Sequence, residues 1–215
     1  MTYADSFLRA HGTKAVILRK PPIFTRMSIK RSTNSVSYLG AREGYYTGIV
    51  LTESGLKSGE VFSIEGEKYL VQSALKSFGD NEIEIMAAKT NAVLELKRYT
   101  ETVDDYGNIV QGWGDIKTNI YSFGEIVTYQ TRQTDPGILE GTRYIFQVSK
   151  VIGFVLRDRI VYNGKNYDVI SIDDVLDGIA RLQVAVDSRG NEIAKASEET
   201  EVDSGNGENG TDGTD

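Results

Sequence analysis

The chain has 215 residues, which is enough for one large domain or two small ones that each bury a core. Its hydrophobic fraction of 40% and charged fraction of 26% are ordinary for a globular protein. No apolar run approaches the roughly 20 residues that span a bilayer, and the first residues lack the basic-then-apolar plan of a secretory signal. The chain has no cysteine, which excludes disulfides and thiolate metal sites and fits synthesis in a reducing cytosol. We therefore expect no membrane association.

The formal net charge of −7 is unevenly distributed along the chain. Residues 1–43 contain eight basic and two acidic residues, whereas residues 191–215 contain eight acids and one base, Lys195. A polar, glycine- and acid-rich segment with almost no apolar side chains cannot bury enough surface to offset its ordering entropy. We predict that residues 189–215 form a flexible acidic tail, with docking on a basic surface of a partner as the alternative.

The first half of the chain, in order, is a short helix-like piece followed by short β-type runs. Tyr3–Ala10 is the helical piece, within an N-terminal arm of residues 1–11. Glu65-Gly66 separates two β-prone runs and indicates a tight hairpin. The predicted strands are Ala15–Leu18, Met27–Lys30, Tyr45–Leu51, Val61–Ile64, Lys68–Val71 and Ile83–Ala87.

The second half continues the β pattern. Asn163-Gly164 is the strongest short hairpin signal in the chain, and Gln130–Gly141 is predicted to be a long polar loop. The lone Trp113 lies in a returning strand, where we expect its large apolar surface to anchor the core. The predicted strands are Ala92–Arg98, Ile109–Trp113, Arg143–Val148, the two arms of a hairpin over Leu156–Asp174, and Ile179–Val184.

An internal repeat divides the chain into two modules. Ile64–Ser73 aligns with Tyr162–Ser171 so that Gly, Tyr, Val and Ser coincide, and upstream Thr13–Leu18 resembles Thr90–Glu95. Chance similarity between hairpins with glycine turns is the alternative. We predict a mainly β protein with two small antiparallel β-barrel or sandwich-like modules in tandem, over residues 12–89 and 90–188.

The second module carries an ordered series of motifs. A strand ends at Arg98, a Thr-Glu-Thr…Asp-Tyr-Gly turn follows over residues 100–107, and Trp113 comes next. Arg143-Tyr144 then opens a strand, and Asp158–Ile172 reads Asp-Arg-Ile-Val-Tyr-Asn-Gly-Lys-Asn-Tyr-Asp-Val-Ile-Ser-Ile. In this order the motifs resemble those of the head–tail joining proteins of tailed phages, also called head–tail adaptor or head-closure proteins. The resemblance covers residues 92–186 and leaves the N-terminal module without a counterpart.

The resemblance implies a structural virion protein of the head–tail neck, assembled in the host cytoplasm. It implies a ring of identical subunits, twelve to match the portal, that binds the portal protein and a neighbouring connector or tail protein. In the predicted loop, five residues are candidates for contact with the portal or a neighbouring subunit, although an ordinary surface connection is the alternative: Arg132, Gln133, Asp135, Ile138 and Leu139. A tail-completion or baseplate adaptor protein is the second function that these motifs allow.

The residues give little support for catalysis. His11 is the sole histidine, so a histidine metal cluster or catalytic triad within one chain would need unusual partners. The carboxylate pairs Asp104-Asp105 and Asp173-Asp174 are adjacent, and adjacent side chains of a strand point to opposite faces. No phosphate-binding glycine loop occurs. We predict that the protein is not an enzyme and uses no metal or cofactor.

The basic N-terminal region leaves a nucleic-acid function open. Basic side chains with tyrosines and Phe24 nearby could bind single-stranded nucleic acid on a small β-barrel, or face passing DNA without sequence specificity. A solvated face or a contact with an acidic protein is the alternative. The candidate residues are Arg19, Lys20, Arg26, Lys30 and Arg31.

Overall fold

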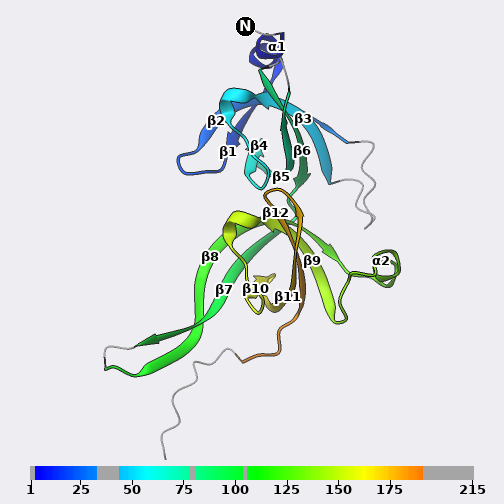
Figure 1. The fold of residues 1–215 in the computed structure, drawn as a ribbon. Coiled ribbons are helices and arrows are strands. Elements are labelled where there is room, and N and C mark those ends of the chain that lie inside the picture. Colours follow the sequence, from blue (N-terminus) through cyan, green and yellow to red (C-terminus); the bar gives the residue numbers. More distant parts are fainter. Residues whose placement is uncertain (1–2, 33–43, 78–80, 104–105, 191–215) are drawn as a thin grey trace, which may run out of the picture.

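The computed structural model describes residues 3–32, 44–77, 81–103 and 106–190. These residues form two closed six-strand antiparallel β-barrels in tandem, preceded by helix α1 (Tyr3–His11), as Figure 1 shows. The predicted mainly β fold is confirmed, and both modules are barrels, not sandwiches. Residues 191–215 of the predicted acidic tail and the pair Asp104-Asp105 lie outside the described residues.

Both barrels have the same strand order. The order is β1-β2-β3-β6-β5-β4 in the first barrel and β7-β8-β9-β12-β11-β10 in the second, and each barrel closes when its fourth strand pairs with its first. The elements of the first barrel are β1 (Thr13–Ile17), β2 (Ile23–Arg31), β3 (Tyr45–Leu51), the 3-10 turn η1 (Thr52–Ser54), β4 (Val61–Ile64), β5 (Glu67–Lys76) and β6 (Glu82–Lys89). Those of the second are β7 (Ala92–Val103), β8 (Ile109–Ile126), helix α2 (Tyr129–Thr134), β9 (Thr142–Ser149), the 3-10 turn η2 (Lys150–Ile152), β10 (Arg159–Tyr162), β11 (Lys165–Leu176) and β12 (Ile179–Val186).

Alternation of side chains along each strand fills the two cores. In β7, Ala92, Leu94 and Leu96 are buried while the residues between them are exposed, as expected when one face of a strand points inward. Phe62 is buried in the core of the first barrel and Phe146 in that of the second. Each barrel therefore has its own hydrophobic core.

The backbone repeats in detail between the barrels. Glu65-Gly66 and Asn163-Gly164 join equivalent strands, and all four residues have positive φ, as a two-residue hairpin turn of the type I′ kind requires. A register shift follows Val71 in β5 and Val169 in β11. The predicted internal repeat is confirmed for the β4–β5 and β10–β11 hairpins.

The repeat at the first strand of each barrel needs a correction. The sequence comparison placed Ile17 opposite Leu94, but Ile17 pairs with Phe62 of β4, and Leu96 pairs with Ile160 of β10. Ile17 and Leu96 are therefore the equivalent residues. The comparison was two positions out because both alignments keep the same alternation of buried and exposed residues.

An arginine and a carboxylate hold the same loop in both barrels. In the second barrel, Arg98 binds both oxygens of Asp158 at 2.7 and 2.8 Å and donates to the carbonyl of Gly153 at 2.9 Å. The Asp158 carboxylate also accepts a hydrogen bond from the backbone of Val155.

In the first barrel, Arg19 occupies the position of Arg98. It donates to Glu60 at 2.9 Å and to the carbonyl of Gly55 at 3.1 Å, and Glu60 accepts from the backbone of Lys57. We call these contacts the Arg19–Glu60 and Arg98–Asp158 clasps. They hold the loop that leads into β4 or β10, the four-residue strand that closes each barrel.

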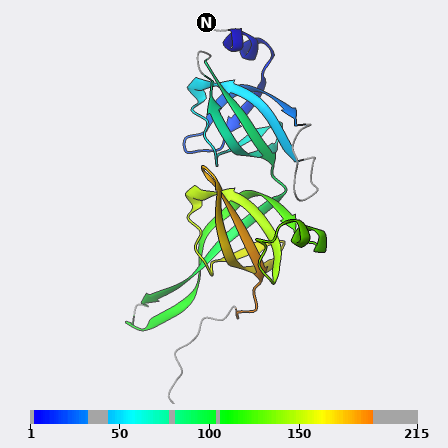
Figure 2. The same ribbon diagram turned by 45° about the vertical axis from the view of Figure 1, so that its right-hand side comes forward.

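The barrels meet through backbone contact and a short connection, best seen in Figure 2. A Cβ atom at Gly59 would lie 2.2 Å from the carbonyl oxygen of Gly178, in the turn between β11 and β12. Arg157, the counterpart of Gly59 in the second barrel, also has positive φ. The conformation alone therefore does not require glycine at position 59, but the contact with Gly178 does. The rings of Tyr45 and Phe123 pack nearby at 5.3 Å between centroids.

We predict that Arg98→Met destabilises the protein more than Arg19→Met does. The Asp158 side chain is 1% exposed, so losing its bidentate partner leaves a buried carboxylate and should cost about 3 kcal/mol. Glu60 is 25% exposed and its clasp has a single ion-pair contact, so the cost there should be about 1 kcal/mol. Urea denaturation followed by circular dichroism measures both, and equal costs would contradict the difference in burial.

Candidate interaction surfaces

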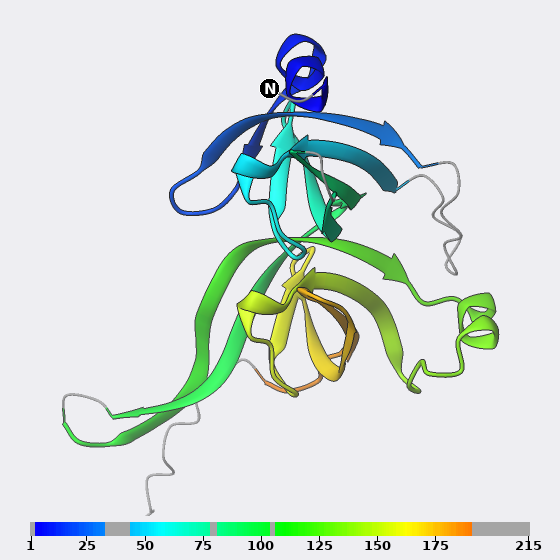
Figure 3. The ribbon, with the colours of Figure 1, turned by 45° about the horizontal axis from the view of Figure 1, so that its top comes forward.

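Strands β7 and β8 extend well beyond the wall of the second barrel. Strand β10 covers β7 only at Glu95–Lys97, and β9 covers β8 only at Phe123–Ile126. The outer parts of β7 and β8, residues 99–103 and 106–116, form a two-stranded arm that projects from the barrel in Figures 1 and 3. Within the described residues, each arm strand has one backbone edge that no other strand pairs with.

The arm carries an exposed apolar end. Val103 lies directly opposite Ile109, and the two are 69% and 61% exposed. Tyr106, in the turn beyond them, is 90% exposed. On the same face, one pair nearer the barrel, Gln111 donates a hydrogen bond to Glu101. From Tyr99 to Ile116 the sequence contains four acidic residues and no lysine or arginine.

Trp113 lies at the base of this arm and not in the core, so its predicted role as a core anchor is wrong. It is half-buried, opposite Tyr99 on the arm. The guanidinium of Arg159 lies over its ring at 3.8 Å from the centroid, and that of Arg189 at 4.7 Å. The returning strand is much longer than the barrel wall, and for this reason Trp113 falls outside the barrel.

The segment that follows β12, Asp187–Gly190, is bound against the base of the arm. Trp113 donates from its indole nitrogen to the carbonyl of Gly190 at 3.3 Å, and Arg159 donates to the carbonyls of Arg189 and Gly190. Arg189 also reaches Asp168 at 2.9 Å. The predicted flexible tail included Arg189 and Gly190, but the carbonyls of both residues and the Arg189 guanidinium are held by these hydrogen bonds.

Asp187 is the charged centre of this cluster. It accepts from Arg159 at 2.7 Å and from Arg189 at 2.8 Å, and its side chain is 1% exposed. Burial raises the pKa of Asp187, but the hydrogen bonds from Arg189 and Arg159 lower it more, giving a pKa of about 2. Arg159 is itself buried. The cluster is thus a paired ionic network that joins β10, the segment after β12 and the arm.

The five residues proposed for portal or subunit contact lie in and after α2. Two of them bind within their own barrel, and the others are exposed or half-buried. Arg132 donates to the carbonyl of Thr142 at 2.9 Å, and Asp135 pairs with Arg181 at 2.5 Å, so both bind within the same barrel. Gln133 and Leu139 are exposed, and Ile138 is half-buried. The contact role of these residues remains a prediction, with Gln133 and Leu139 the two best placed for it.

The segment that contains them is not a plain loop as predicted. Thr128 and Thr131 form a capping box that starts helix α2. The buried side chain of Gln183 then accepts from the backbone of Leu139 at 2.8 Å and donates to the carbonyl of Gly137 at 2.9 Å. These contacts hold the segment against β12.

The five basic residues proposed to face DNA or an acidic partner do not converge on one surface. Arg19 is engaged in its clasp, and exposed Lys20 lies in the turn between β1 and β2. Exposed Lys30 and Arg31 lie at the far end of β2, a nine-residue strand and hence about 30 Å long. Arg26 lies between them and donates to the carbonyl of Gly12 at 2.9 Å.

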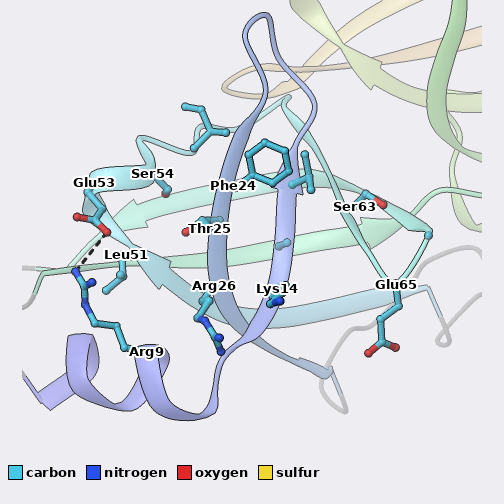
Figure 4. A pocket seen from close by; sticks show the side chains of 14 residues that line it. Arg9, Lys14, Phe24, Thr25, Arg26, Leu51, Glu53, Ser54, Ser63 and Glu65 are labelled. Atoms are coloured by element: carbon cyan, nitrogen blue, oxygen red, sulfur yellow. Dashed lines mark ion pairs between the residues drawn. The ribbon is translucent and has the colours of Figure 1, made fainter.

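A groove of about 820 Å³ lies on the outer face of the first barrel (Figure 4). Phe24, which is 78% exposed, lies opposite Val16 on the paired strands β1 and β2. Lys14 lies opposite Arg26, one pair further along the same face. Lys14 is missing from the predicted basic residues, although its alternation with buried Ala15 in β1 is a sequence signal for this outer face. On one side of the groove, Arg9 of α1 forms an ion pair with Glu53 at 3.7 Å.

The described residues show few groups that converge as catalytic groups do. Among them, no group of three or more His, Cys, Asp or Glu side chains is placed to hold a metal ion. His11 is exposed at the end of α1, with its ring 5.4 Å from that of Phe7. Within the same described segments, no helix has the length and apolar character needed to cross a membrane.

Comparison with known proteins adds no family assignment. The chain matches no protein-family model, and no curated protein matches it significantly in sequence.

We predict that Asp187→Asn destabilises the protein at neutral pH by about 2 kcal/mol or more, because a carboxyl whose pKa falls from 3.8 to about 2 on folding stabilises the ionised folded state by that amount. This contribution is complete above pH 3.8 and is lost as the pH falls through the folded-state pKa of about 2. Urea denaturation of both proteins as a function of pH should show the gap closing toward pH 2. A difference in unfolding free energy that does not change with pH would show that the effect comes from packing and not from the charge of Asp187.

We predict a modest cost for Trp113→Ala. Loss of two cation–π contacts at a half-buried ring should cost about 1–2 kcal/mol, below the roughly 3–5 kcal/mol expected of a core aromatic residue. Trp113→Phe keeps an aromatic face under Arg159 and serves as the control, with about half the loss expected. Urea denaturation is the measurement, and a cost near 5 kcal/mol would show that the ring is essential to the barrel.

Proposed function

We propose that the protein is a structural component of the tailed-phage neck, where a ring of copies binds the portal and joins or closes the head toward the tail. The observation that carries the proposal is the projecting arm with its exposed apolar end, Val103, Tyr106 and Ile109. Exposing three large apolar side chains to solvent is unfavourable for a monomer. Such a feature is typical of protein–protein contact sites.

The closed barrels strengthen this reasoning. Closure pairs most strand edges of each barrel, although β5 and β11 run beyond β4 and β10, which pair with them only at Glu67–Leu70 and Lys165–Asp168. The arm differs from these wall segments because it projects from the barrel and both of its strands have an open backbone edge. A partner strand can add to such an edge by main-chain hydrogen bonds. The arm belongs to the module whose motifs resemble those of the head–tail joining proteins, residues 92–186.

Portal binding tests the proposal. Purified portal rings should retain the wild-type chain, and the double variant Val103→Ser, Ile109→Ser should bind about tenfold more weakly or worse, as loss of buried apolar anchors implies. Val151→Ser is the matched control, since Val151 is 89% exposed on the second barrel away from the arm. Absence of portal binding, together with binding to tail tubes or baseplate components, would replace the neck assignment by the tail-completion or baseplate alternative.

Single-stranded nucleic-acid binding is the less favoured alternative, because the proposed basic residues are spread along the length of β2. A variant that removes the charges of Arg26, Lys30 and Arg31 separates the two. Unchanged salt-dependent affinity for a single-stranded oligonucleotide in that variant would exclude this surface as a nucleic-acid site.

A further inference from the structure

We propose that the arm of one copy docks in the groove of the first barrel of a second copy. The arm residues are Val103, Ile109 and Glu101, and the groove residues are Phe24, Val16, Lys14 and Arg26. This proposal names the self-contact that the proposed ring would use. It rests on the proposed function only for closure of the ring, and not for the contact itself. An arm docked in this way affects portal binding through assembly of the ring and not by direct contact with the portal.

The first step is the match of pattern between the two surfaces. On the arm, Glu101 and Gln111 lie on the same face as the apolar pair Val103–Ile109, two residues nearer the barrel along each strand. In the groove, Lys14 and Arg26 lie on the same face as the apolar pair Val16–Phe24, two residues away along each strand. Next-but-one residues on a strand are about 7 Å apart on both surfaces. Apolar side chains can therefore meet apolar ones while the Glu101 carboxylate meets the basic pair.

The second step is charge. Lys14 and Arg26 lie directly opposite each other on paired strands, an arrangement in which like charges repel and destabilise the sheet. Lys14 has no ion-pair partner among the described residues. A carboxylate from outside the chain would relieve this repulsion. The groove lining also holds Glu65 and the pair Arg9–Glu53, so its basic residues exceed its acids by one. The stretch from Tyr99 to Ile116, with four acids and no base, has the sign opposite to that of the Lys14–Arg26 pair.

The third step is geometry. Figures 1 to 3 show the arm leaving the second barrel on the side away from the first barrel, whereas the groove lies on the first barrel. The arm of one chain therefore cannot reach its own groove. The contact joins two unlike surfaces of two copies, and a contact of this kind propagates from copy to copy until it closes into a ring or continues as a filament.

The experiment uses two variants of the full chain and sedimentation velocity across the micromolar range. Ile109→Ser disables the arm and leaves the groove, and Phe24→Ser disables the groove and leaves the arm. Each variant alone should be monomeric, at the 23.8 kDa mass of one chain. Their equimolar mixture should form a dimer and stop, because the intact arm fills the intact groove and only disabled surfaces remain. Wild type should assemble beyond the dimer.

Charge reversal tests the pairing of side chains. Lys14→Glu should weaken wild-type assembly by about tenfold, as a desolvated charge contact implies, and Lys14→Glu with Glu101→Lys should restore it. Lys76→Glu, at an exposed position of β5 outside the groove, is the matched control and should leave assembly unchanged. Thermal unfolding of each variant shows that it is folded.

The proposal is overturned if wild type stays monomeric throughout, or if the two-variant mixture either stays monomeric or grows past the dimer. A monomeric wild type whose Lys14→Glu variant loses salt-dependent oligonucleotide binding would assign the groove to nucleic acid instead. Portal binding by a monomeric chain would overturn the arm–groove contact and leave the proposed function standing. Assembly through the arm without any portal binding would support the arm–groove contact and overturn the proposed function.

Discussion

Each barrel depends on a carboxylate placed just before its shortest strand. Strands β4 and β10 have four residues each and close their barrels with few ladder bonds. Glu60 and Asp158 accept hydrogen bonds from the loop leading into those strands, and Arg19 and Arg98 tie each carboxylate to the end of the first strand or to the base of the arm. Because both barrels have such a clasp, we infer that the short closing strand is the part of each barrel that most needs stabilisation.

Closure also determines where the molecule can interact. Because closure pairs most of the wall edges, elements that leave the barrel or hollow its outer face are the most accessible contact surfaces. The arm is such an element, and Trp113, Arg159 and Asp187 fix its base through stacking and ion pairing. A rigid base matters because an arm that already holds its binding geometry loses less conformational entropy when it docks.

The hairpins were readable from the sequence because their signals are local: Glu65-Gly66 and Asn163-Gly164 specify turns whatever surrounds them. Closure of the sheets into barrels could not be predicted, since a barrel and a sandwich bury the same alternating residues. Trp113 was wrongly predicted to lie in the core because strand propensity indicates a strand but not the residue at which that strand leaves the barrel. The loss of apolar alternation in β7 after Leu96 was the available sequence signal. The clasps join residues far apart in sequence, and only the recurrence of Arg19 with Glu60 and Arg98 with Asp158 in the two repeats could have indicated them.

The contact between Gly59 and Gly178 has a consequence for assembly. Two backbone segments that meet with no room for a Cβ atom, reinforced by Tyr45 against Phe123, limit the hinge that a short connection would otherwise allow. Arm and groove then belong to one body with a set spacing and angle. In a chain of copies linked arm to groove, that angle is the rotation from each subunit to the next. The number of copies in a closed ring would accordingly be a property of the barrel joint, and a change at Gly59 would alter it without touching either docking surface.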